Sequence, residues 1–132
     1  MLKRTVTYTD YNGEERTEDF YFNLSRTELM ELQASVPGGL AEYMAAISAA
    51  KDIPKMMEFF KSILLKSYGE KSLDGKHFKK TPEIVDNFVD TQAYDEIFQW
   101  VMGGENTMSE FLTGIMPKDV ADSVRQKLNA GK

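Results

Sequence analysis

The chain's only histidine, His77, is the first residue to test for chemistry, because Glu70 and Asp74 lie close to it in the sequence. A catalytic histidine needs an orienting carboxylate and a pocket that faces the substrate. A metal site built on histidine normally needs further His or Cys ligands, and the chain has no cysteine. The neighbouring lysines disfavour binding of a cation. We therefore predict that His77 is a polar residue of a connecting loop.

Three carboxylates, Glu83, Asp86 and Asp90, have spacings of three and four residues and share one face of a predicted helix. Such a face could bind a hard cation, but apolar residues lie opposite it, so a solvent-exposed face is the better interpretation. No glycine pair has the position of a phosphate-binding loop. The sequence thus predicts no catalytic or metal-binding residue, no cofactor, and a protein that is not an enzyme.

Composition narrows the class of protein. With 132 residues, of which 42% are hydrophobic and 28% charged, the chain has the size and composition of one soluble domain over 1–132. No apolar run approaches the roughly 20 residues of a membrane span, and the N-terminal stretch lacks the apolar region of a signal peptide. The absence of cysteine suits a cytoplasmic protein.

Charge is unevenly distributed along the chain. The net charge is −5; residues 81–117 carry seven acids and no base, whereas residues 67–80 carry four bases and two acids. An acidic chain with one short basic segment is a poor candidate for nucleic-acid binding, where a basic face normally supplies the affinity. The contrast fits either complementary patches for self-association or two solvated surfaces, and solvated surfaces are the more common case.

The N-terminal part predicts an antiparallel β-hairpin over 3–24. Threonine and aromatic residues are dense there, and an Asn-Gly pair is a strong turn signal. A two-residue loop would place the apolar residues of the two strands on opposite faces. An odd loop, with the turn glycine in the left-handed conformation, would place them together. These apolar residues are Val6 and Tyr8 on the first strand, and Phe20, Phe22 and Leu24 on the second, which we expect to pack on helices.

Residues 25–128 predict a helical body, so the expected fold class is α+β, a hairpin followed by a mostly α-helical bundle. Ser25 begins a capping box, Thr81 and Thr91 can cap later helices, and Thr107 begins a second capping box. Gly69 is the expected C-cap of the third helix. The predicted helices cover 26–34, 40–50, 52–69, 92–104, 109–115 and 117–128, and one more starts at 82.

Methionine is frequent in this chain, with eight residues. Its flexible, polarizable side chain is over-used at adaptable binding surfaces, although gap-filling in a core is its ordinary role. We select Met56, Met57 and Met108 as candidate partner-binding residues. Burial in the core is the alternative for each of them.

Three segments carry a recognisable pattern of turn and core residues: LLKSYGEKSLDGKHFKK, FVDTQAYDEIFQWV and FLTGIMP. The pattern is Tyr-Gly-x-Lys-Ser-x-Asp-Gly-x-x-Phe, then Phe-x-x-Thr-x-Ala-Tyr, then Phe-x-x-Gly-Ile-x-Pro. It resembles small proteins of the tail-gene clusters of long-tailed bacteriophages, the tail assembly chaperones. The resemblance also implies that Tyr68 and Phe78 anchor the ends of a structural loop in the core.

This resemblance implies a non-enzymatic protein that binds the tape-measure protein in the bacterial host cytoplasm during tail morphogenesis. A tape measure is a very long helical chain with exposed apolar stripes, so its chaperone needs an adaptable apolar groove. A structural virion or tail component of a bacteriophage is the alternative function, and a small hydrolase or metal-dependent enzyme is a more distant one. A homo-oligomer is compatible with the sequence, and no nucleic-acid or membrane partner is expected.

Overall fold

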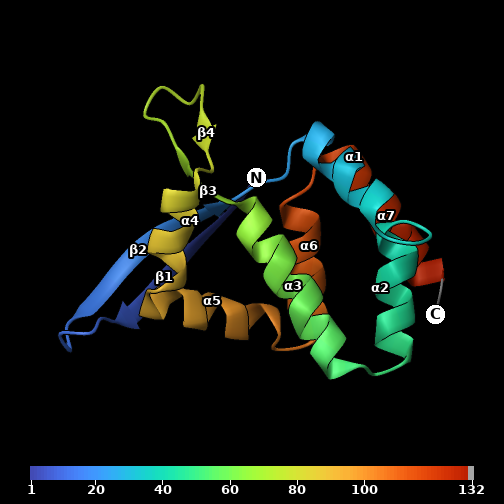
Figure 1. Cartoon of the computed structure of the whole chain (residues 1–132), viewed down its shortest axis with the longest axis horizontal. Coiled ribbons are helices and arrows are strands. Elements are labelled where there is room, and N and C mark those ends of the chain that lie inside the picture. Colours follow the sequence, from blue (N-terminus) through green and yellow to red (C-terminus); the bar gives the residue numbers. More distant parts are fainter. Residues whose placement is uncertain (131–132) are drawn as a thin grey trace.

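The computed structural model describes residues 1–130, with side chains described as far as Gln126. Strands β1 (Leu2–Thr9) and β2 (Glu15–Phe22) form the predicted N-terminal hairpin, and helices make up most of the remainder, which confirms the α+β class (Figure 1). The helices are α1 (Arg26–Ser35), α2 (Leu40–Ala49), α3 (Ile53–Ser67), α4 (Pro82–Val89), α5 (Gln92–Val101), α6 (Glu105–Gly114) and α7 (Lys118–Ala130). Two short strands between α3 and α4, β3 (Tyr68–Lys71) and β4 (Phe78–Lys79), extend the sheet to the order β1-β2-β3-β4.

The hairpin has the odd loop that its apolar pattern predicts. Val6 pairs with Glu18, so even-numbered residues lie opposite even-numbered residues. The Gly13 N–H donates to the Asp10 carbonyl at 3.0 Å, and Gly13 has a φ of +81°. Glycine suits this left-handed conformation because it has no Cβ. The predicted apolar residues therefore share one face: Val6, Phe20 and Phe22 are buried, and Tyr8 is half-buried.

Side-chain caps begin three of the helices as predicted. At α1, the Glu28 N–H donates to Ser25 Oγ at 3.1 Å, and the Ser25 N–H donates to Glu28 Oε1 at 2.9 Å. The hydroxyl oxygens of Thr81 and Thr91 accept from backbone N–H groups in the first turns of α4 and α5, both at 3.3 Å. These bonds satisfy N–H groups that have no partner within the helix.

The second predicted capping box is wrong. Helix α6 begins at Glu105, two residues before Thr107, and Gly104 is its N-cap. The Thr107 hydroxyl instead donates to the carbonyl oxygens of Gly104 and Val101, at 3.0 and 3.3 Å. A threonine in the first turn of a helix can bond backward to the chain in this way, and the motif Thr-x-x-Glu alone does not distinguish the two arrangements.

The stretch predicted as a loop after α3 is a second, shorter hairpin. Gly69 lies in β3 and pairs with Tyr21 of β2. The prediction that Gly69 caps α3 is therefore wrong, because the backbone already adopts an extended conformation at Tyr68. A Cβ at position 69 would lie 2.7 Å from the Phe78 ring and 2.8 Å from the carbonyl oxygen of Lys79. Glycine is therefore needed there for the close approach of β4.

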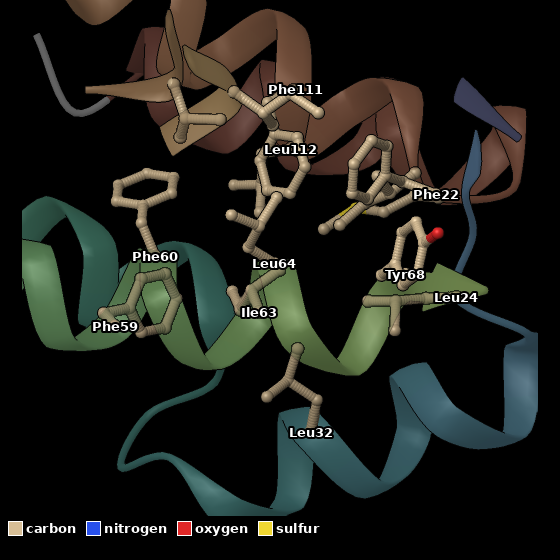
Figure 2. Packing of buried hydrophobic residues seen from close by; sticks show 14 of the residues in the cluster. Phe22, Leu24, Leu32, Phe59, Phe60, Ile63, Leu64, Tyr68, Phe111 and Leu112 are labelled. Carbon is tan, nitrogen blue, oxygen red and sulfur yellow. The ribbon is translucent and has the colours of Figure 1, made fainter. Parts of the chain in front are cut away.

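The core lies between the apolar face of the N-terminal hairpin and the helices. In Figure 2, α3 and α6 lie against each other and their apolar side chains meet; the labelled residues of α3 are Phe59, Phe60, Ile63 and Leu64, and those of α6 are Phe111 and Leu112. Phe22 joins the sheet to this layer, because its ring centroid is 5.6 Å from that of Tyr68 and 6.0 Å from that of Phe111.

Lys80 ties the segment before α4 to the start of α1. Its Nζ is 2.6 Å from the carbonyl oxygen of Asn23 and 2.8 and 2.9 Å from the two carboxylate oxygens of Glu28. Partial burial of Glu28 raises its pKa, but hydrogen bonds from Lys80 and Ser25 outweigh this effect and hold the pKa below its usual value. The ion pair therefore fixes where the second hairpin leaves the helical body.

Candidate functional site

The structure places His77 in a hydrogen-bonded turn, with its side chain exposed. Its backbone N–H donates to Ser72 Oγ at 3.0 Å, and its carbonyl accepts from the Ser72 N–H at 2.9 Å. Asp74 belongs to the same turn, because its Oδ1 accepts from the Ser72 hydroxyl at 2.6 Å and from the Lys76 N–H at 3.0 Å. These bonds lower the pKa of the Asp74 carboxyl. Asp74 therefore organises backbone, as Asx turns do, and the stretch is a polar connection.

Only one of the two aromatic residues at the ends of this hairpin lies in the core. Tyr68 is buried and stacks on Phe88 with ring centroids 4.0 Å apart, and burial raises the pKa of Tyr68 to about 12. Phe78 is half-buried and lies outside the core. The prediction that both anchor the segment is therefore right for Tyr68 and wrong for Phe78, which lies on β4, one of the two edge strands of the sheet.

The three carboxylates, two in α4 and one at its C-cap, lie on the predicted solvent-exposed face. Glu83, Asp86 and Asp90 are all exposed, whereas Phe88 on the opposite side of the helix is buried. Within the described residues, no group of three or more His, Cys, Asp or Glu side chains could hold a metal ion.

The candidate methionines lie near the N-terminal ends of α3 and α6. Helices α3 and α6 lie side by side (Figures 1 and 2) and begin at the same end of the helical body. Met57 is 45% exposed, whereas Met56 and Met108 are half-buried against the core. Ile53, one helical turn before Met57, is 55% exposed and was not among the predicted site residues. We call Ile53, Met56, Met57 and Met108 the methionine end.

Two grooves lie between elements that are distant in the sequence, and neither was predicted. The first, of about 370 Å³, separates α2 from α7, where small residues such as Ala41 and Ala45 leave room beside Val120 and Val124. The second, of about 400 Å³, lies between β1 and α5. In this second groove the Arg4 guanidinium carbon is 4.0 Å from the centroid of the Trp100 ring, a cation–π contact.

These features define the class of protein: a small α+β protein whose distinctive surfaces are exposed apolar side chains and grooves between elements. In the described residues, no helix is long and apolar enough to cross a membrane. The chain belongs to the phage tail assembly chaperone family, whose model matches residues 1–131. No curated protein and no solved structure matches the chain.

Proposed function

We propose that this chain binds the tape-measure protein of the phage tail in the host cytoplasm, without catalysis, while the tail is built. The family supplies the context of tail assembly. The observation that carries the proposal is the methionine end, where Ile53 and Met57 expose 55% and 45% of their surface on one face of α3.

The chemistry of this end suits a helical partner. An amphipathic helix binds by laying its apolar face into an apolar groove or patch. Ile53 and Met57 are four residues apart in α3 and thus lie on the same face, where they can cover such a stripe. Met56 and Met108 lie half-buried beside the core. Because methionine is unbranched and polarizable, it adapts to partners of different shape, which a long client with many helical segments requires.

Co-expression tests the proposal. A tape-measure protein that is insoluble alone is expected to become soluble when this chain is present. The double variant Ile53→Glu with Met57→Glu is expected to abolish the rescue, because it places two charges in the apolar contact. Met30→Glu is the control for adding a charge at an exposed methionine, since Met30 is 72% exposed on a different helix, α1. Rescue that survives the double variant, or that Met30→Glu abolishes equally, contradicts this surface.

The composition of the mature virion separates this function from that of a structural tail component. A chaperone is expected to be absent from purified virions, because it leaves its client when the tail is complete. Quantitative mass spectrometry of virions measures this directly. A fixed copy number of this chain in mature particles would replace the proposed function by the structural one.

A further inference from the structure

Strand β1 is an edge of the sheet, and its outer side is open along the whole strand. It pairs with β2 without interruption from Leu2 to Thr9. The loop bond between Asp10 and Glu14 sets the pattern, because hydrogen-bonded residues alternate along an antiparallel ladder. The even-numbered residues of β1 therefore bond to β2, and the odd-numbered residues turn their N–H and C=O groups away from it. Nothing in the part of the chain that the structure describes bonds to these outward groups.

The outer-face side chains of β1 are held across the hairpin and do not cover this edge. Lys3 Nζ is 3.6 Å from the Asp19 carboxylate, to which the Thr5 hydroxyl also donates at 2.6 Å, and the hydroxyl oxygens of Thr7 and Thr17 are 2.9 Å apart. Natural edge strands are usually protected by charged side chains, prolines or bulges. Strand β1 has no proline and pairs without a bulge, so its outward peptide groups are accessible.

Helix α5 packs against β1, and the two form a groove of about 400 Å³ along the open edge. Four consecutive residues of β1, 4–7, line one wall of this groove, and α5 lines the other. The groove is polar, because its residues Val6 and Ile97 are buried whereas Glu96 and Gln99 are exposed. An occupant therefore meets open peptide groups on one side and polar side chains on the other.

Glu96 gives this groove an unpaired carboxylate. It forms no ion pair with any side chain that the structure describes, and residues 81–117 contain no base. Arg4 is stacked on the ring of Trp100, with its guanidinium carbon 4.0 Å from the ring centroid, and Trp100 is one helical turn further along α5 than Glu96. The carboxylate thus favours a basic side chain in an occupant.

We propose that β1 accepts an extended segment of a partner protein as a further strand of the sheet, with a basic side chain of that segment against Glu96. An extended chain is the occupant that these groups select, because it presents N–H and C=O groups at the same two-residue spacing as the open edge. The side chains on its outer face would lie beside Thr5 and Thr7, where β-branched residues fit best. This surface is separate from the methionine end, so the proposal does not depend on the proposed function.

A second copy of the chain is a poor occupant of the same edge. Pairing of β1 with another β1 about a two-fold axis would put both α5 helices on one face of the joined sheet, at either side of the junction. Each α5 carries Asp95 and Glu96 and no base, so the two helices would repel each other. The charge of the groove therefore favours a different, basic partner.

Fluorescence anisotropy with a labelled synthetic peptide tests the charge preference. The probe has the length of β1, eight residues, with lysine at the fourth position and threonine at every other, because threonine is both β-branched and polar. A peptide with glutamate in place of the lysine is expected to bind the wild-type chain about tenfold more weakly, or less. Glu96→Gln is expected to remove most of this difference. Equal binding of the two peptides by the wild type, or no saturable binding of the lysine peptide, overturns the proposal.

N-methylation of the same peptide tests strand addition itself. A strand turns every second N–H toward its neighbour, so methylation of one alternate set of amides is expected to abolish binding and methylation of the other set to be tolerated. Equal effects of the two sets overturn strand addition, whatever the affinity.

Thr7→Pro removes one outward N–H from β1 and keeps the bonds to β2, as an edge strand allows. It is expected to weaken peptide binding about tenfold, and Thr7→Val, which keeps the N–H, is expected to bind like the wild type. Thermal melts show whether both variants fold. Binding that Thr7→Pro leaves intact contradicts the edge as the site, and wild-type dimers that Thr7→Pro dissociates in sedimentation velocity would assign the edge to a second copy and overturn the proposal.

Discussion

Gly69→Ala measures how firmly β4 is seated on β3. Gly69 does not have a positive φ, so the added methyl group causes no backbone strain, and its effect depends on its neighbours alone. The new Cβ would lie 2.7 Å from the ring of Phe78 and 2.8 Å from the carbonyl oxygen of Lys79. The half-buried ring can turn away, but the carbonyl belongs to the backbone of β4 and moves only if the two strands separate.

The expected loss in the free energy of unfolding is the difference between two opposing effects. Overpacking of this kind costs about 1–3 kcal/mol, whereas the smaller conformational entropy of alanine in the unfolded chain returns about 0.4–1 kcal/mol. We expect the free energy of unfolding to fall by about 1–2 kcal/mol and Tm to fall by roughly 3–10 °C. Gly104→Ser is the control with the opposite sign: nothing lies within 4 Å of its Cβ position, and serine can cap α6, so a gain of about 0.5–1 kcal/mol is expected.

Urea denaturation followed by circular dichroism distinguishes these outcomes. Gly69→Ala is expected to lower the midpoint without changing the m-value, since the surface exposed on unfolding stays the same. If the variant unfolds at the same urea concentration as the wild type, β4 moves away from the added methyl group at no measurable cost. In that case the close approach of β3 and β4 does not hold the hairpin, and the rigidity of its tip must come from the turn alone.

Three further predictions follow from burial and from shifted pKa values. His77→Ala is expected to change the free energy of unfolding by less than about 0.5 kcal/mol, and the half-buried Phe78→Ala by about 1–2 kcal/mol, below the value for a fully buried ring; a larger loss at His77 in denaturant melts would reverse this assignment. The lowered pKa of Glu28 means that its stabilisation is present above its unfolded pKa and is lost as the pH falls through the folded pKa. The stability difference between wild type and Glu28→Gln is therefore expected to shrink on acidification, and a difference that does not vary with pH contradicts the ion pair with Lys80. The pKa of Tyr68, raised from 10.0 to about 12, gives stabilisation that is present below pH 10 and is lost as the pH rises toward 12; Tyr68→Phe is expected to be less sensitive to alkali than the wild type in the same melts, and equal sensitivity would contradict the shift.

Local signals in the sequence predicted the elements whose partners are close in the chain. The capping box at Ser25, the caps at Thr81 and Thr91, and the odd loop around Gly13 each depend on residues within a few positions of one another. Strands β3 and β4 were missed because they have four and two residues, too few for a period-two pattern. Their position depends on the pairing of Tyr21 with Gly69, which no local motif encodes.

The surface was less predictable than the fold, for a related reason. Met56 and Met57 are adjacent, so they point in directions about 100° apart on the helix, and only the packing of neighbouring helices decides that Met57 is the exposed one. The sequence could have indicated Ile53 as a further candidate, because it precedes Met57 by one turn of the same helix. The groove between β1 and α5 lies between residues that are about 90 positions apart in the sequence, and spacing along the chain carries no information about it.

The outermost position of β1 in the sheet affects how the protein behaves when it is crowded by its own copies. Hydrogen-bonded pairs alternate along an antiparallel ladder, and the bond from the Asp10 N–H to the Glu14 carbonyl, at 2.8 Å, begins the series. The peptide groups of the odd-numbered residues of β1 therefore point away from β2, and no described segment pairs with them. An edge of this kind is a template for amyloid-like stacking. Its outward-facing residues are Lys3, Thr5, Thr7 and Thr9, all exposed and none of them apolar. Stacking of hairpins along this edge would bring the lysines of successive copies close together. It would also bury no apolar face. The strand therefore keeps its unpaired hydrogen-bonding groups but does not seed aggregation.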